Sequence, residues 1–232
     1  MPSRILITGA SRGIGRSLVS HYLDRGDLVI GCARTPFGIT HERFHEYALD
    51  VNDPQAVRDV FRQVCATVGG LDAIVNNAGI ANMNAIALTP LASARAVMET
   101  NFLGTFVVSQ AAIRVLRASP SPRIVNVTSI AVPLRLQGEA VYAASKSAVE
   151  TFTRIAAREL APFRITCNAV GPSPIRTALT AGVPERTMQA LVDDQPIPRW
   201  AEASDVANVI DFFLSPQSSL VTGQVVYLGG WS

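Results

Sequence analysis

The fold is decided near the N-terminus, where residues 4–15 read Arg-Ile-Leu-Ile-Thr-Gly-Ala-Ser-Arg-Gly-Ile-Gly. A short apolar run, typical of a strand, leads directly into a glycine-rich turn and then into a helical pattern. Glycine lets the backbone turn tightly and approach a phosphate closely, and a helix N-terminus stabilises the negative charge there. The stretch predicts a strand-turn-helix unit that binds a dinucleotide, although a tight turn without a ligand would use the same glycines.

The rest of the chain repeats this alternation. Strands are predicted at 4–8, 28–32, 47–51, 73–76, 123–128, 165–170 and 225–228, and helices at 14–25, 54–68, 93–116, 142–160 and 204–214, the last beginning at Ser204 and Asp205. The strands are almost continuously apolar, which favours one Rossmann-type α/β domain, residues 1–232: a doubly wound parallel sheet of about seven strands with helices on both faces. Ligands of such sheets bind beyond the carboxyl ends of the strands.

Composition limits the class of protein. The 232 residues are 48% hydrophobic with a net charge of +2, which excludes a disordered chain and gives no electrostatic reason to expect nucleic acid. No apolar run approaches the length of a membrane span, and the first strand begins too early to leave room for a signal peptide. The three cysteines are odd in number and widely spaced, so free thiols in a cytoplasmic protein are expected.

Two motifs point elsewhere and are set aside. Residues 9–13 match G-x-S-x-G, the nucleophile elbow of α/β-hydrolases, but all three histidines lie in the first fifth of the chain, so Ser11 has no general base in the required order. Residues 41–45 match H-E-x-x-H, which binds zinc when it lies on a helix. Here His41 and His45 lie in a short connection between two strands, and no metal site is predicted.

A third motif carries acid-base chemistry. Residues 142–146 read Tyr-Ala-Ala-Ser-Lys, and Lys146 is the only lysine among 20 basic residues. The spacing of four places Tyr142 and Lys146 on the same face of a helix, where an ammonium would lower the phenol pKa from about 10 and make the tyrosine a usable general acid. Thirteen residues upstream, Ser129 ends a strand, where its hydroxyl could polarise a carbonyl. The alternative is an exposed helix pair with a chance surface lysine.

Together these residues resemble the classical short-chain dehydrogenase/reductase family over essentially the whole chain. Residues 8–15 resemble its TGxxxGxG cofactor turn, and residues 76–79, Asn-Asn-Ala-Gly, resemble its NNAG motif. The catalytic tetrad of the family is matched in order and spacing by Asn101, Ser129, Tyr142 and Lys146. The similarity is to the 3-oxoacyl-carrier-protein reductase-like branch.

The resemblance implies an oxidoreductase that interconverts a carbonyl and a secondary alcohol by hydride transfer. Tyr142 would be the general acid or base and Ser129 would bind the same carbonyl oxygen. Lys146 would hold the nicotinamide ribose, and Asn101 would position a water for the proton relay. The residues expected to bind the cofactor are Gly9, Ser11, Arg12, Gly13, Ile14, Gly15, Arg34, Asp50, Val51, Asn77, Ala78, Gly79, Tyr142, Lys146, Pro172, Ile175 and Thr177.

The choice of cofactor follows from the end of the second strand. Enzymes that use NAD place a carboxylate there to bind the adenosine ribose diol. Here the sequence at 32–35 is Cys-Ala-Arg-Thr, and Arg34 and Arg12 could instead clamp a 2′-phosphate. NADP(H) is predicted, with an NAD-dependent alcohol dehydrogenase as the alternative. Asp50 resembles the adenine-contacting position of the family, or else it belongs to a helix-capping turn toward Pro54.

Two departures from the family pattern affect the expected shape. Only about a dozen residues, 36–46, separate the second and third strands, where the resemblance implies a full helix, so the adenosine side is expected to be more open. Ser173 stands where glycine is usual in the turn 171–177, which leaves open the path of the following segment, a substrate lid predicted at 178–200.

The substrate is less defined by the sequence. A largely apolar cavity is predicted from Pro133, Leu134, Leu136, Val141, Leu179, Met188 and Leu191. Arg135 or Arg176 could bind an acidic substrate group, or each could be a solvated surface residue. Residues 161–163, Ala-Pro-Phe, lack the basic residue that the resemblance associates with carrier-protein docking, which favours a stand-alone carbonyl reductase or a specialised pathway enzyme.

The predicted partners are a small carbonyl or alcohol substrate and, by family analogy, further copies of the chain in a homodimer or homotetramer, with no nucleic acid and no membrane. A non-catalytic NADP(H) sensor on the same fold is the alternative function. Such proteins generally lose the catalytic tyrosine or lysine, whereas this chain has both.

Overall fold

A computed structural model describes residues 2–231. These residues form a seven-stranded, all-parallel sheet in the order β3-β2-β1-β4-β5-β6-β7. The strands are β1 (Arg4–Thr8), β2 (Leu28–Ala33), β3 (Phe44–Ala48), β4 (Ala73–Asn76), β5 (Arg123–Val127), β6 (Thr166–Gly171) and β7 (Val225–Tyr227). The predicted doubly wound α/β fold is confirmed.

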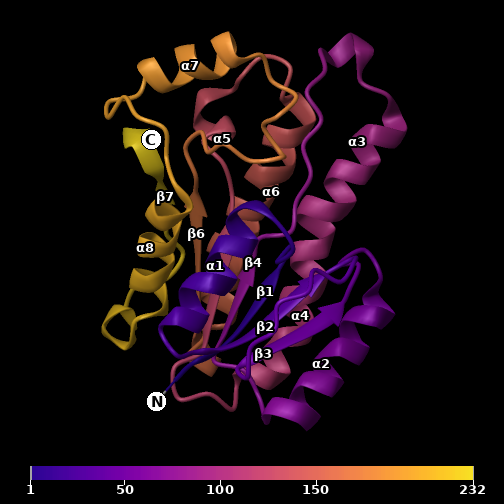
Figure 1. Ribbon diagram of the computed structural model, residues 1–232, viewed down its shortest axis with the longest axis vertical. Helices are drawn as coiled ribbons and strands as arrows, with labels where there is room; N and C mark the ends of the chain where they lie inside the picture. Colours follow the sequence, from indigo (N-terminus) through magenta and orange to yellow (C-terminus); the bar gives the residue numbers. More distant parts are fainter. Residues whose placement is uncertain (1, 232) are drawn as a thin grey trace.

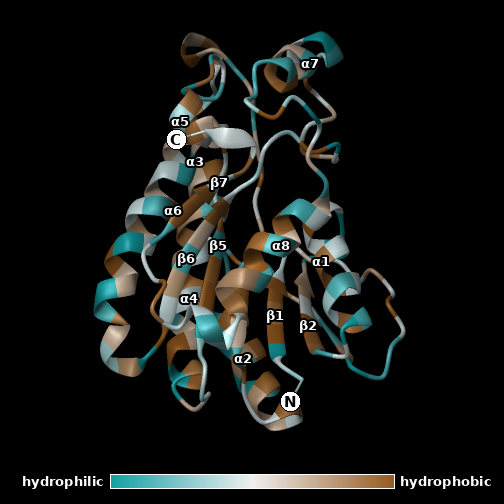
Figure 2. Ribbon diagram, turned by 90° about the vertical axis from the view of Figure 1, so that its left-hand side faces the viewer, coloured by the Kyte–Doolittle hydropathy of each residue, from teal (hydrophilic) through white to brown (hydrophobic). Residues whose placement is uncertain are grey.

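Helices cover both faces of the sheet (Figures 1 and 2). One face carries α1 (Gly13–Asp24) and α8 (Ala203–Leu214), and the other carries α2 (Pro54–Val68), α4 (Gly104–Leu116) and α6 (Ala140–Glu159). Successive strand residues point to opposite faces, so Leu6 joins the α2–α4–α6 core while Ile5 and Ile7 join the α1–α8 core. Burial on both faces explains why the strands are apolar without alternation.

Three further helices lie toward the carboxyl ends of the strands: α3 (Leu91–Met98), α5 (Ala131–Leu134) and α7 (Glu185–Asp193). In both views α5 and α7 occupy the end of the molecule opposite the N-terminus (Figures 1 and 2). Among residues 2–231, no helix combines the length and the apolar character that crossing a membrane requires.

The third strand differs from its prediction. It was expected at 47–51 but occupies Phe44–Ala48, and residues 34–43, which connect it to β2, contain no helix. Leu49 and Val51 are buried in the core just beyond the strand, which gives residues 47–51 the alternation of a strand. Because β3 is an edge strand, it tolerates the polar residues His45 and Glu46, which made residues 44–46 look like a loop.

The helix predicted at 93–116 is interrupted. The structure has α3, then a π-helical segment at Glu99–Leu103, then α4. A π-helical turn places one extra residue in the helix and often occurs at functional sites. The last helix also begins differently: Glu202, not Ser204, is its N-cap, and Asp205 completes a capping box with it.

Candidate active site

The glycine-rich turn after β1 forms the floor of a long groove. Gly9 and Gly13 adopt positive φ angles of 67° and 55°, which favour glycine, and α1 begins at Gly13 with no acidic residue in its first turn. The first N–H groups of a helix have no partner within the helix, so the start of α1, which lines the groove at Gly13 and Ile14, carries a partial positive charge. A group with negative charge fits there, as the sequence predicts.

This outer groove has a volume of about 760 Å³ and lies beyond the ends of β1, β2 and β4. Most of the residues predicted to bind the cofactor line this groove: Gly9, Ser11, Arg12, Gly13, Ile14, Arg34, Asp50, Val51, Asn77, Ala78, Gly79 and Thr177. The sequence did not single out Phe37, Leu49, Asn52 and Thr100, which also line it, because they follow no glycine or charge motif.

Gly15 lies beneath the groove and is the tightest point of the turn. A Cβ atom there would lie 2.2 Å from the Gly9 carbonyl oxygen and 2.6 Å from Asn77 Nδ2. Asn77 holds the turn in place, since its Nδ2 donates to the carbonyl oxygens of Thr8 and Gly9. Thr8 Oγ1 in turn accepts from the backbone N–H groups of Asn77 and Ala78. The motif at 76–79 therefore fixes the shape of the glycine turn.

Gly15→Ala is expected to destabilise the protein by about 1–3 kcal/mol, because the added methyl group forces the Gly9 carbonyl and the Asn77 amide apart. The same displacement would weaken dinucleotide binding. Urea unfolding and a titration with NADPH measure the two effects. Gly182→Ala is the control, since a Cβ there meets nothing within 4 Å. Unchanged unfolding and affinity in Gly15→Ala would show that the turn is more open than the structure has it.

The adenosine end of the groove has a basic character. Arg12 and Arg34 are exposed and line it, and no carboxylate follows β2. Asp50 lies in the turn after β3, where its carboxylate accepts from the Asn52 N–H at 3.0 Å. The cap of the next helix is Asp53, so Asp50 does not take the helix-capping role.

The inner cavity adjoins the groove and has a volume of about 140 Å³. Ile14, Asn77, Gly79, Thr177 and Leu179 line both spaces, so the two are continuous. Ser129, Tyr142 and Lys146 line the inner cavity together, as do Pro172 and Ile175. A cavity of this size accommodates a molecule about as large as benzene.

Tyr142 is 7% exposed on the first turns of α6. Burial raises its pKa to about 12, a hydrogen bond with the Ser129 hydroxyl opposes that rise, and the nearby Glu139 carboxyl adds to it. The expected lowering by Lys146 is therefore not found: Lys146 Nζ lies 5.9 Å from the centre of the Tyr142 ring, and desolvation dominates. At neutral pH Tyr142 holds its proton.

Lys146 is 4% exposed, and its Nζ donates to the Val127 carbonyl oxygen at 2.8 Å. Burial lowers the pKa of Lys146 to about 8. Within residues 2–231 no carboxylate lies within ion-pair distance of Nζ. The alternative of an exposed surface lysine is therefore wrong.

Asn101 lies in the π-helical segment and is fully buried. Its Oδ1 accepts from the Ile80 N–H, and its Nδ2 donates to the Ile80 carbonyl oxygen and to Ser145 Oγ. These bonds use both Nδ2 donors and one lone pair of Oδ1, so the side chain ties residue 80 to α6. Its part in a water relay stays a prediction.

Glu150 is a buried carboxylate that the sequence reasoning missed. It accepts hydrogen bonds from Thr128 Oγ1 at 2.7 Å and from the Tyr227 hydroxyl at 2.6 Å. These contacts join α6 to the ends of β5 and β7, one helical turn beyond Lys146. The position is visible in the sequence only as the fourth residue after the lysine.

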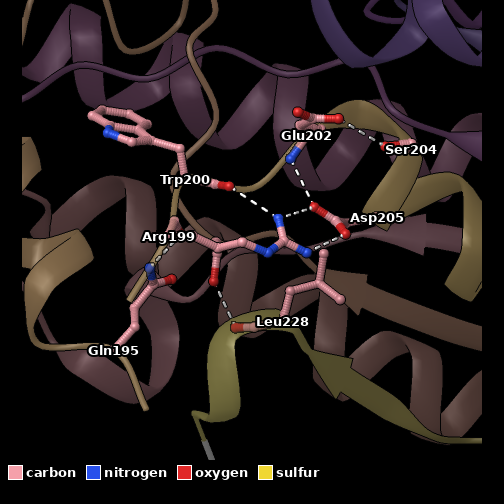
Figure 3. A network of polar contacts seen from close by, with 8 residues as sticks. Gln195, Arg199, Trp200, Glu202, Ser204, Asp205 and Leu228 are labelled. Atoms are coloured by element: carbon pink, nitrogen blue, oxygen red, sulfur yellow. Dashed lines mark hydrogen bonds and ion pairs between the residues drawn. The ribbon is translucent and has the colours of Figure 1, made fainter. Parts of the chain in front are cut away.

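The segment at 178–200 carries α7 and is attached at both of its ends. Arg176 stacks on the Trp200 ring at 4.0 Å and forms an ion pair with Glu185 at 2.7 Å. Arg199 forms two hydrogen bonds with the Asp205 carboxylate, and Gln195 Nε2 donates to the Arg199 carbonyl oxygen (Figure 3). Arg176 is thus engaged in this network, and neither Arg176 nor Arg135 lines the inner cavity.

The turn at Ser173 is held by a bond that glycine lacks. Ser173 is buried and its Oγ donates to the Leu228 carbonyl oxygen at 2.7 Å.

The apolar lining of the inner cavity was predicted in part. Leu136, Leu179, Met188 and Leu191 line the cavity, whereas Pro133, Leu134 and Val141 do not. Residues 41–45 span a loop and the start of β3 rather than a helix, and within residues 2–231 no cluster of three potential metal ligands occurs.

Comparison with known proteins shows the family to which the chain is similar. Residues 9–231 match the family model described as enoyl-(acyl carrier protein) reductase. The 3-oxoacyl-[acyl-carrier-protein] reductase FabG of Vibrio cholerae is 32% identical over 97% of this chain and 95% of its own length. A chain from Sinorhizobium meliloti assigned to the short-chain alcohol dehydrogenases superimposes with a TM-score of 0.91, at 33% identity, covering 98% of this chain and 95% of that one.

A solved structure of ElxO with NADP bound has a TM-score of 0.89 at 28% identity, covering 98% of this chain and 97% of that one. The protein belongs to the short-chain dehydrogenase/reductase family, whose cofactor is NAD(P)H, and it is an oxidoreductase related to the FabG ketoreductases.

Proposed function

We propose that the protein is an NADP(H)-dependent reductase that converts a small ketone or 3-oxoacyl-type carbonyl to a secondary alcohol. The observation that carries the proposal is the continuity of the two spaces. A groove lined by the N-terminus of α1 and by two exposed arginines opens into a small cavity in which Ser129, Tyr142 and Lys146 meet.

When bound, NADPH supplies the hydride. Tyr142 holds its proton at neutral pH, because burial raises its pKa to about 12, so the phenol is ready to protonate a substrate oxygen. The Ser129 hydroxyl lies beside it and can donate to the same oxygen. Lys146 and Asn101 support the site. Lys146 is held by its hydrogen bond to the Val127 carbonyl oxygen, and Asn101 holds the loop at Ile80 by a hydrogen bond to its backbone.

The residues present fit NADP(H). The glycine turn leaves room for a pyrophosphate against the N-terminus of α1, and the absence of a carboxylate after β2, with Arg34 in its place, suits a 2′-phosphate. We also propose residues 178–200 as the substrate lid, since Leu179, Met188 and Leu191 cover the inner cavity.

Arg34→Asp is expected to weaken NADPH binding by about tenfold to a hundredfold and to leave NADH binding unchanged or tighter. A charged hydrogen bond contributes about 1.5–3 kcal/mol, and the new carboxylate would repel the 2′-phosphate. Titration of both cofactors measures the ratio, with the exposed Arg114→Asp on α4 as the control. If the unaltered protein bound NADH as tightly as NADPH, the choice of NADP(H) would be wrong.

The function is tested by following NADPH consumption against 3-oxoacyl thioesters, 3-oxoesters, diketones and small ketones. Turnover of a thioester would support acyl-chain reduction, and turnover of small carbonyls alone would support a stand-alone reductase. Tight NADPH binding with no turnover would support the alternative of a non-catalytic NADP(H) sensor.

We further propose a cytoplasmic homodimer or homotetramer. Phe106 on α4 and Ile155 on α6 are exposed apolar residues that such an assembly would cover.

A further inference from the structure

One acidic side chain, Glu139, lines the inner cavity within the described residues. It occupies the N-cap position of α6, three residues before Tyr142, and it is half-buried. The remaining lining is mostly apolar, with Met83, Leu136, Leu179 and Met188 among it. The carboxyl group therefore stands out chemically from the surface that surrounds it.

The Glu139 carboxyl has no protein partner among residues 2–231. Its side chain makes no capping hydrogen bond, and burial raises its pKa with no hydrogen bond or cation to oppose that effect. The arginines that could have paired with it lie elsewhere: Arg135 is exposed, and Arg176 binds Glu185.

The polar groups near it make hydrogen bonds with other partners. Ser129 Oγ accepts from the Ala131 N–H at 3.1 Å, and Lys146 Nζ donates to the Val127 carbonyl oxygen. A half-buried carboxyl without a partner is costly, and a partner that arrives with a ligand removes that cost. The two oxygens of Glu139 are thus acceptors in the cavity that no protein group among residues 2–231 satisfies.

We propose that Glu139 determines substrate specificity by binding a hydrogen-bond donor, an ammonium or a hydroxyl group, placed a few bonds from the reacting carbonyl. The same carboxyl disfavours an anionic substrate, because like charges repel in a cavity with little water. The volume of about 140 Å³ limits this substrate to a small molecule. The inference rests on the proposed function, since it concerns the same cavity.

Four ketones of similar size test the proposal: aminoacetone carries an ammonium, hydroxyacetone a hydroxyl, butanone no donor, and pyruvate a negative charge. We expect kcat/KM for aminoacetone or hydroxyacetone to exceed that for butanone by about tenfold to a hundredfold, with pyruvate lowest. The difference should fall mainly in KM, because the group that Glu139 binds does not change during the reaction.

Glu139→Gln separates the two donors. The neutral carboxamide should abolish the preference for aminoacetone over butanone, while its oxygen keeps part of any preference for hydroxyacetone. Glu159→Gln is the matched control, since it removes the same charge from an exposed position on the same helix. Thermal unfolding checks that each variant is folded.

The ratio of kcat/KM for aminoacetone or hydroxyacetone to kcat/KM for butanone tests the proposal. A ratio that is the same in Glu139→Gln as in the unaltered protein, or a preference for pyruvate, overturns the proposal. A titration of the NADP⁺-loaded protein with aminoacetone and butanone gives the same comparison without turnover. If that titration shows the Glu139-dependent preference but no ketone is reduced, the proposed function fails and the recognition by Glu139 stands.

Discussion

Tyr142→Phe is expected to lower the rate of ketone reduction by about a hundredfold to ten-thousandfold while NADPH binds as before. The phenol is the protonated acid in the inner cavity, and general acid catalysis contributes an effect of that size. Only the hydroxyl is lost, so the buried ring still fills its place in α6. Lys146 Nζ donates to the Val127 carbonyl oxygen and lies 5.9 Å from the centre of the Tyr142 ring, so it does not occupy the position of the phenol hydroxyl.

Single-turnover reduction and an NADPH titration of the same samples measure the two properties. Tyr47→Phe is the control, since Tyr47 lies on β3 and its hydroxyl bonds to Thr67, outside both spaces. A Tyr142→Phe variant that reduces ketones at the unaltered rate would remove Tyr142 from the mechanism. Loss of NADPH binding in that variant would indicate a structural role instead.

The raised pKa of Tyr142 also sets the direction of the pH dependence. A proton donor with a pKa of about 12 stays protonated through neutral and mildly alkaline pH, so reduction should not decline there through Tyr142. Three effects set the pKa of this phenol. Desolvation and the Glu139 charge raise the pKa, and the hydrogen bond with the Ser129 hydroxyl lowers it. Glu139→Gln should therefore move the alkaline limb of the profile to lower pH.

The sheet and the glycine turn could be predicted because their signals are local. An apolar run followed by glycines, as at residues 4–15, requires a strand, a tight turn and a helix whatever the rest of the chain does. The order of the tetrad was likewise enough to place Ser129, Tyr142 and Lys146 together, since parallel strands end at one edge of the sheet.

The features that could not be predicted from the sequence depend on contacts between segments that are distant along the chain. The π-helical segment around Asn101 exists in a helix whose apolar periodicity shows no break, and its amide is satisfied by Ile80 and Ser145. The pKa of Tyr142 depends on burial, which the four-residue spacing to Lys146 does not report. Glu139 looks like an ordinary surface charge until residues 130–139 fold over the cavity.

Lys146→Met is expected to abolish turnover and, at the same time, to stabilise the fold at neutral pH. Lys146 is 4% exposed and its pKa falls from 10.5 to about 8 because burial disfavours the ammonium. That difference corresponds to about 3 kcal/mol of destabilisation when the side chain is charged. The loss of the charged hydrogen bond to the Val127 carbonyl subtracts about 1.5–3 kcal/mol, which leaves a net gain of about 0–1.5 kcal/mol at pH 7.

The sign of the pH dependence follows from the lowered pKa. Below pH 8 the folded and unfolded chains both hold the proton, and the folded protein carries the whole cost of the buried charge. Between pH 8 and 10.5 the folded protein has released the proton and the unfolded chain has not, so the contribution of Lys146 to stability rises with pH. The advantage of Lys146→Met should therefore shrink across this window.

Urea unfolding of both proteins at pH 7 and pH 10 measures this change as a difference between them. The difference isolates Lys146, because Cys32, Cys167 and Tyr142, whose pKa values burial raises, affect both proteins alike. Arg158→Met, an exposed cation on the same helix, should show no such trend. A Lys146→Met variant less stable than the unaltered protein at pH 7 would mean that the ammonium stabilises the fold. The expected result means that the chain retains Lys146 for chemistry at a cost in stability.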